Sequence, residues 1–86
     1  MKSKNRHDNF IRKCESLSPR QAEAADLLIL DIPFDEIADR MGIGWEQVKG
    51  HFQHIRRKMG VRSRVGLALQ WAHYRTLVPK WLEEQT

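Results

Sequence analysis

The stretch GWEQVKGHFQHIRRKMGVRSR, residues 44–64, decides how this chain folds. Its apolar residues recur at helical spacing, and they are Val48, Phe52, Ile55 and Met59. Side chains spaced by three or four residues lie on one face of an α-helix, so the pattern predicts a helix over about residues 45–59. Gly60 follows directly, and a glycine at this place is typical of a helix end.

The opposite face of this helix is polar and basic. It carries Lys49, His51, Gln53, Arg56 and Arg57. The whole stretch holds six Lys or Arg residues and one Glu. A basic run is often only a solvated helix face. Bases mixed with Gln and His, and hardly diluted by acids, more specifically indicate a surface that contacts nucleic acid.

Charge is segregated along the chain. The 86 residues carry a formal net charge of +4, from 15 Lys or Arg residues and 11 Asp or Glu residues. Residues 15–46 hold eight acids and two Arg, whereas residues 49–64 hold six bases and no acid. We therefore expect one acidic surface and one basic surface on the same small body.

Length and composition limit the class of protein. A chain of 86 residues suffices for one small domain. Apolar residues make up 41% without any run of about 18 that could span a membrane. The basic N-terminus leads into no apolar segment, which argues against a secretory signal. The single Cys14 cannot form an internal disulfide, so a reducing cytoplasm is the simplest compartment, and we expect this thiol to be inert.

Three further helices are predicted around the basic one. Ser18 is a suitable N-cap, with Pro19 in the first helical position and Gln21 completing a capping box, for a helix to about residue 30. The sequence FDEIADRM, residues 34–41, predicts a short helix that ends at the next glycine. Ser63 is a suitable N-cap for a last helix that runs to about residue 76.

These helices predict an all-α fold, a four-helix domain over residues 17–78. Residues 1–16 are expected to form a basic arm, mobile apart from a short helix near residues 8–15. Residues 79–86 are expected to form a short C-terminal extension.

The last helix has two apolar stripes, more than a four-helix domain can bury alone. We expect one stripe, formed by Val65, Ala68, Leu69 and Ala72, to enter the core. The second stripe would then remain exposed and form the contact of a homodimer. This expected dimer interface consists of Leu67, Gln70, Trp71 and Tyr74.

A short helix, a tight glycine-containing turn and a longer basic helix together form a helix-turn-helix, whose second helix enters the major groove of DNA. Four segments then follow, in order, the pattern of one family: LSPRQAEAADLLIL, DEIADRMGI, VKGHFQHIRRKMGVRSR and ALQWA. Over about residues 17–76 the chain resembles the LuxR/FixJ/GerE-type helix-turn-helix domain. The resemblance implies a four-helix DNA-binding domain of bacterial transcription regulators, which usually dimerises through its last helix.

Site residues follow partly from this resemblance. Lys49 matches the family's groove-reading lysine, and His51 matches a family histidine for which we expect phosphate contact. Gln53 and Gln47 can each pair with adenine through both amide atoms. The expected base contacts are therefore Lys49, Gln53 and Gln47. The expected phosphate contacts are His51, Arg56, Arg57, Lys58, Arg62 and Arg64, although one of Arg56, Arg57 and Lys58 could instead lie over the core.

The chain departs from the family pattern at four positions. Gln47 replaces the usual Thr, and Gly50 lacks the side chain that commonly follows the lysine. Trp45 stands where a small or charged residue is usual, and Gly66 replaces a Glu that normally completes a capping box. These changes concern the family's usual base contacts rather than the fold.

The expected function is that of a stand-alone, dimeric, sequence-specific DNA-binding transcription regulator of a bacterium, phage or plasmid, in the cytoplasm with the nucleoid. The expected partners are double-stranded DNA, a second copy, and RNA polymerase or a larger LuxR-type regulator, without membrane contact. An alternative is a protein antagonist that pairs with a larger LuxR-type regulator or with the transcription machinery. The intact RRKMGVRSR segment argues against it, because an antagonist has no need of phosphate contacts.

Two other classes fit less well. A sigma-like promoter-recognition module has a similar helix-turn-helix, but the segment that follows it here fits the LuxR type better. The sequence shows no constellation typical of an enzyme and implies no cofactor. His51 and His54 form a pair without a third ligand, so no metal site is expected.

Overall fold

The computed structural model describes the backbone of residues 2–84 and the side chains of residues 8–82. This part of the chain consists of helices and connecting loops, without a strand. In chain order the helices are α1 (Lys2–Glu15), α2 (Pro19–Leu28), α3 (Phe34–Met41), α4 (Trp45–Met59), α5 (Arg64–Leu77) and α6 (Lys80–Glu84). The all-α fold is confirmed, and the four expected helices correspond to α2, α3, α4 and α5.

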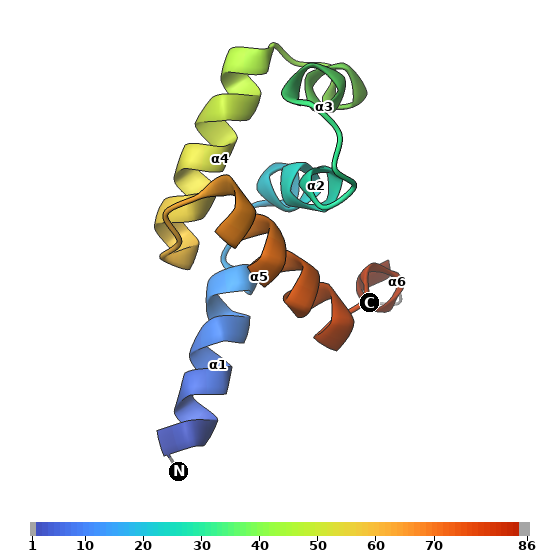
Figure 1. The fold of residues 1–86 in the computed structure, drawn as a ribbon. Helices are drawn as coiled ribbons and strands as arrows, with labels where there is room; N and C mark the ends of the chain where they lie inside the picture. Colours follow the sequence, from blue (N-terminus) through green and yellow to red (C-terminus); the bar gives the residue numbers. More distant parts are fainter. Residues whose placement is uncertain (1, 85–86) are drawn as a thin grey trace.

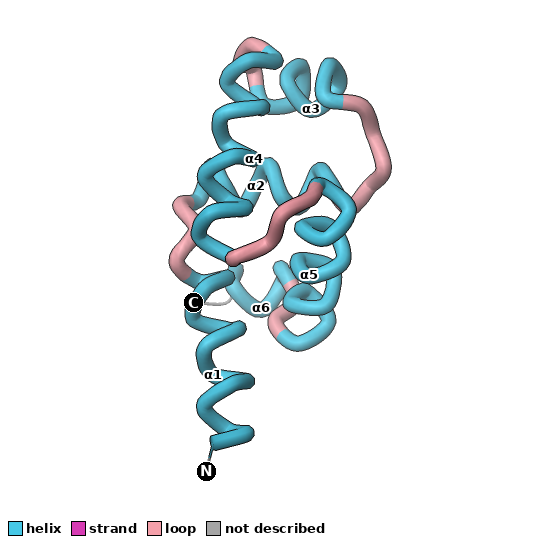
Figure 2. The backbone as a smooth tube through the Cα atoms, turned by 60° about the vertical axis from the view of Figure 1, so that its left-hand side comes forward, coloured by secondary structure: helices cyan, strands magenta, loops and turns pink. Residues whose placement is uncertain are grey.

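The helices surround one apolar core. In Figure 1, α3 lies at one end of α4, α2 lies below α3, and α1 extends beyond the other end of α4. Figure 2 shows the same order along the length of the molecule, with α5 beside α4. The buried residues are Cys14, Leu17, Ala24, Ala25, Leu28, Ile37, Ala38, Met41, Val48, Phe52, Ile55, Met59, Leu67, Trp71 and Tyr74. Every helix from α1 to α5 therefore contributes to the same core.

Capping residues fix where the helices begin and end. Ser18 Oγ accepts a hydrogen bond from the Gln21 amide at 3.2 Å, and Gln21 Oε1 accepts one from the Ser18 amide at 3.0 Å. This confirms the capping box at the start of α2. Gly42 and Gly60 end α3 and α4 in the left-handed region, with φ of 69° and 70°, as expected for helix-ending glycines.

The N-terminal segment differs from the expected mobile arm. It is one continuous helix from Lys2 to Glu15, longer than the short helix expected near residues 8–15. Its Phe10 ring lies 5.3 Å from the His73 ring and 6.5 Å from the Tyr74 ring, between centroids. Cys14 from the same helix is 2% exposed. The spaced apolar residues of α1 therefore pack on the core, where helix formation satisfies the backbone hydrogen bonds.

The two stripes of α5 are exchanged relative to the expectation. Leu67, Trp71 and Tyr74 are buried in the core, at 0%, 1% and 2% exposure, whereas Val65 and Leu69 are each 68% exposed. Residues buried inside one protomer cannot form the surface of a dimer contact. The assignment of Leu67, Trp71 and Tyr74 to the dimer interface is therefore wrong, while Gln70 of that set is exposed.

Packing against α2 explains this exchange. α2 contributes the small side chains Ala24 and Ala25 to the core, so large side chains from α5 fill the remaining volume. Asp26 of α2 also accepts a hydrogen bond from Trp71 Nε1 at 2.7 Å. An inward Trp needs such a partner for its N–H group, and α2 supplies it.

Candidate nucleic-acid interface

The pair α3 and α4 forms the predicted helix-turn-helix. The connection between the helices turns at Gly42, and the Ile43 amide donates a hydrogen bond to the Ala38 carbonyl at 3.0 Å. The rings of Phe34 and Phe52 stack, with centroids 5.1 Å apart and planes inclined by 19°. Val48 and Ile55 of α4 are both fully buried. These contacts hold α4 in one orientation, with its polar face directed away from the core.

The exposed face of α4 presents the basic and amide groups that the sequence predicted. Lys49, Gln53 and Arg57 lie along it at four-residue spacing, and all three side chains are exposed. Residues 47–64 include no acid. The face can therefore place cationic and amide groups against a polyanion without internal ion pairs competing for them.

Gln47 has a structural role in the first turn of α4. Its Oε1 accepts a hydrogen bond from the Gly44 amide at 3.0 Å. Because Gly44 precedes the helix, this bond satisfies one of the free amides at the helix start. A bidentate contact with adenine would also use Oε1 as an acceptor, so the cap restricts the orientations in which Gln47 can make such a contact.

Trp45 and Lys49 lie together at the start of α4. The Lys49 ammonium lies 5.5 Å from the centroid of the Trp45 ring, within cation–π range. Trp45 itself is 52% exposed. The ring therefore restrains Lys49 on the polar face and contributes an exposed aromatic surface beside it.

The six expected phosphate contacts fall into two groups. Arg57 and Arg62 are exposed, and His51 and Arg56 are half-buried on α4. Lys58 instead donates hydrogen bonds to the Ser16 carbonyl at 3.0 Å and to Gln21 Oε1 at 2.9 Å. Arg64 donates a hydrogen bond to the Ile32 carbonyl at 3.2 Å. Lys58 and Arg64 thus join parts of the fold, a role that spacing in the sequence does not indicate.

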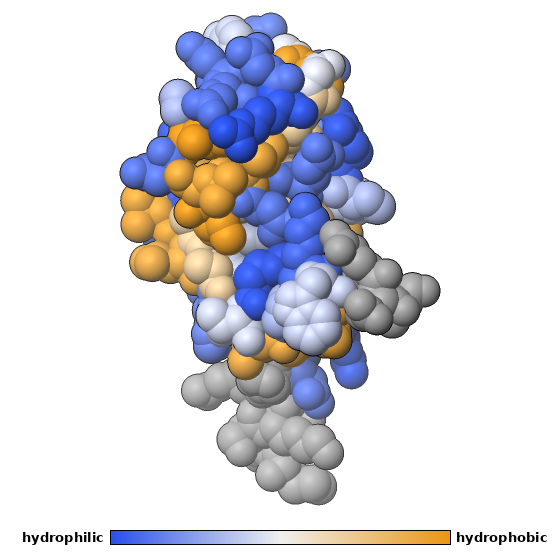
Figure 3. Space-filling model, turned by 90° about the vertical axis from the view of Figure 1, so that its right-hand side faces the viewer, coloured by the Kyte–Doolittle hydropathy of each residue, from blue (hydrophilic) through white to orange (hydrophobic). Residues whose placement is uncertain are grey.

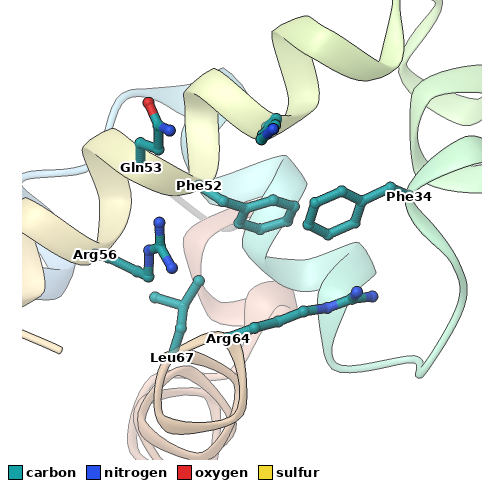
Figure 4. A pocket seen from close by; sticks show the side chains of 7 residues that line it. Phe34, Phe52, Gln53, Arg56, Arg64 and Leu67 are labelled. Atoms are coloured by element: carbon teal, nitrogen blue, oxygen red, sulfur yellow. The ribbon is translucent and has the colours of Figure 1, made fainter. Parts of the chain in front are cut away.

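A hollow opens between α4 and the start of α5, with a volume of about 150 Å³. Its lining consists of Phe34, Lys49, Phe52, Gln53, Arg56, Arg64 and Leu67. Figure 4 shows the Phe34 and Phe52 rings side by side, with Arg64 extending past them and Arg56 above Leu67. The Arg64 guanidinium carbon lies 4.2 Å from the Phe34 ring centroid. Sequence reasoning missed this site, because its residues come from three helices that only the fold brings together.

Other chemistry finds little support among the residues that the structure describes. They include no cluster of three or more His, Cys, Asp or Glu side chains that could hold a metal ion. Burial raises the pKa of the Cys14 thiol from 9.0 to about 11, against a smaller opposing effect of Arg75. At neutral pH this thiol is therefore protonated and a poor nucleophile. No helix in the described part is long and apolar enough to cross a membrane.

Comparison with known proteins places the chain among bacterial regulators. The family described as bacterial regulatory proteins, luxR family, matches residues 15–70. Over 62 residues the chain is 36% identical to the nitrate/nitrite response regulator protein NarL of Escherichia coli K12. The same identity and coverage hold for the NarL protein of Escherichia coli O6:H1, strain CFT073. These matches cover 72% of this chain and 28% of the relatives' length. No solved structure gives a significant match.

Proposed function

The chain belongs to the luxR family of bacterial regulatory proteins, which are DNA-binding transcription regulators, and from this premise we propose that it recognises specific duplex sequences by placing α4 in the major groove. The observation that carries the proposal is the polar face of α4. There Lys49, Gln53 and Arg57 are exposed on a helix whose other face is fixed in the core.

Each part of this face has a chemical role in the proposal. Lys49 and Gln53 contact base edges, because an ammonium suits guanine acceptors and an amide suits adenine. The proposed phosphate contacts are His51, Arg56, Arg57 and Arg62. These cations release counterions from DNA and provide affinity that does not depend on sequence. The cap at Gln47 makes this side chain a weaker candidate for base contact than Gln53.

We further propose that the protein binds DNA as a homodimer through the exposed stripe of α5. Val65 and Leu69 project from this helix with most of their surface in water, and Gln70 is exposed beside them. Figure 3 shows apolar surface gathered on one side of the molecule. Leu30 is a further exposed apolar side chain. A self-complementary apolar stripe suits a two-fold contact. It would set two copies of α4 against a palindromic site.

The proposal is tested by selecting bound duplexes from a random pool and measuring their affinity by fluorescence anisotropy at several salt concentrations. Lys49→Ala and Gln53→Ala are each expected to weaken binding to the selected site by about 1–3 kcal/mol and to relax the sequence preference at one base pair. Lys80→Ala on α6 is the control, because it removes the same charge far from α4.

Two results would contradict the proposal. One is an unchanged affinity in the double variant with Lys49→Ala and Gln53→Ala. The other is a stoichiometric protein partner that co-purifies after nuclease treatment while no duplex is enriched. The second result would favour the antagonist function instead.

A further inference from the structure

We propose that the hollow between α4 and α5 binds a small planar aromatic carboxylate, and that this ligand competes with DNA for the polar face of α4. The site itself depends only on the geometry of the hollow. The competition rests on the proposed function, because Lys49 and Gln53 line the hollow and also belong to the proposed DNA contacts.

The shape of the hollow suits a single aromatic ring. Its volume of about 150 Å³ is similar to that of a cavity known to take up benzene. The rings of Phe34 and Phe52 border it, with centroids 5.1 Å apart. Leu67 also lines the hollow, with its side chain fully buried in the core. A ring placed here can contact these two side chains and bury apolar area.

The charges around the hollow favour an anion. Lys49, Arg56 and Arg64 all line it, and its lining contains no acid. Arg56 is half-buried there, and a neutral ring beside it would offer its guanidinium no acceptor. A carboxylate joined to the ring can accept paired hydrogen bonds from the guanidinium of Arg56 or Arg64. The combination of an apolar wall and a cationic rim therefore selects an aromatic acid.

The apolar wall also separates this ligand from a DNA phosphate. A phosphodiester is strongly hydrated, and burying it against Phe34 and Phe52 would cost its hydration. A phosphate would therefore remain at the rim, on the cations, and leave the wall uncovered. Only a group that combines a ring with a negative charge uses both parts of the lining.

A bound aromatic acid would oppose DNA binding by charge and by space. It would neutralise positive charge beside the polar face and occupy volume next to Lys49 and Gln53. Two ligands that use the same groups lower each other's affinity by the same factor. We therefore expect an aromatic acid to release the protein from DNA and excess DNA to release the acid.

The direct test uses the full chain without DNA and titrates it with benzoate, followed by amide shifts in ¹H–¹⁵N spectra. We expect saturable shifts at Phe34, Phe52 and Leu67, with a dissociation constant on the order of 1 mM for so small a ligand. Benzyl alcohol, which keeps the ring without the charge, should bind at least about tenfold more weakly. Acetate and inorganic phosphate, which lack the ring, should also bind at least about tenfold more weakly than benzoate.

Neighbouring arginines provide matched variants. Arg56→Gln removes a cation that lines the hollow and should weaken benzoate binding. Arg57→Gln removes the next charge along α4, which does not line the hollow, and should leave benzoate affinity unchanged. Equal effects of the two variants would overturn the proposal. So would the absence of saturable shifts, or equally tight binding of phosphate.

The competition is measured separately, as anisotropy of labelled duplex at constant ionic strength with benzoate or acetate. Loss of DNA binding with benzoate but not with acetate supports the proposal. Benzoate that saturates the hollow without changing DNA affinity would contradict the competition and the use of Lys49 and Gln53 on DNA, and leave the ligand site standing. Normal DNA binding, together with no saturable amide shifts in the benzoate titration, would contradict the ligand site and leave the proposed function intact.

Discussion

Lys58 Nζ lies 3.0 Å from the carbonyl oxygen of Ser16, so the C-terminal turn of α4 is bonded to the junction between α1 and α2. The same ammonium donates to Gln21 Oε1, which also belongs to the capping box of α2. One side chain thus connects α4 both to α2 and to the segment between α1 and α2. This use of Lys58 separates it from Arg57, its neighbour on the exposed face.

We expect Lys58→Met to lower the free energy of unfolding by about 1 kcal/mol, because two hydrogen bonds are lost while the aliphatic part is kept. Arg57→Ala should leave stability unchanged and reduce the salt dependence of DNA binding by about one phosphate contact. Urea unfolding and anisotropy at several salt concentrations measure the two effects. A reduced salt dependence in Lys58→Met equal to that in Arg57→Ala would restore Lys58 to the phosphate contacts.

Asp26 joins α2 to α5 through a partly buried network. Its Oδ1 accepts hydrogen bonds from Trp71 Nε1 at 2.7 Å and Arg75 Nε at 2.8 Å, and Oδ2 accepts one from Arg75 Nη2 at 3.1 Å. The Asp26 and Arg75 side chains are 16% and 11% exposed. Asp26→Ala would leave a buried N–H group and a poorly solvated cation without this carboxylate.

We therefore expect Asp26→Ala to lower the free energy of unfolding by about 3 kcal/mol. Glu23→Ala on the same helix is the control, because its ion pair with Arg20 is exposed and should contribute less than about 1 kcal/mol. Thermal and urea unfolding give both values. A cost for Asp26→Ala no larger than that for Glu23→Ala would show that the network is solvated in solution.

The helices could be predicted from the sequence because local signals agree there. Ser18 with Gln21, and the glycines at positions 42 and 60, fix three helix boundaries by capping chemistry that needs no tertiary contact. The buried face of α4 followed from spacing alone. The base and phosphate contacts remain predictions.

Tertiary packing explains where the prediction from the sequence was wrong or incomplete. Both stripes of α5 have helical spacing, and spacing alone does not say which of them faces α2. Trp71 points inward because it packs beside the small side chains of α2 and bonds Asp26. The hollow combines Phe34, Phe52 and Leu67 from three helices, so no local pattern contains it. The hydrogen bonds of Lys58 likewise reach Ser16, which is 42 residues away along the chain, and Gln21, which is 37 residues away.

Burial of Cys14 makes stability depend on pH in the alkaline range. The pKa of this thiol is about 11 in the folded protein against an ordinary value of 9.0, because burial disfavours the thiolate. The folded state therefore holds the proton more tightly. Its stability is complete below about pH 9 and falls as pH rises toward about 11.

We expect the protein to lose about 1 kcal/mol between pH 8 and pH 10 relative to Cys14→Ala, which has no thiol to titrate. Urea midpoints of both proteins at the two pH values give the difference. Native protein at pH 8 should also resist alkylation by iodoacetamide until urea unfolds it. Rapid alkylation of the folded protein, or parallel pH profiles for the two proteins, would show that Cys14 is accessible to water.

The exchanged stripes of α5 give the clearest test of assembly. Leu69 is 68% exposed, so Leu69→Glu should cost little stability in a single protomer. Leu67, two residues earlier, is fully buried, and Leu67→Ala should lower the free energy of unfolding by about 2–5 kcal/mol.

Sedimentation equilibrium, with and without a palindromic duplex from the selection, measures how Leu69→Glu changes self-association. We expect monomers that still bind a half-site but no longer bind the two half-sites of the full site cooperatively, since two charges would meet across the two-fold contact. Unchanged self-association in Leu69→Glu would place the dimer contact elsewhere, whereas unfolding of this variant would contradict the exposure of its face.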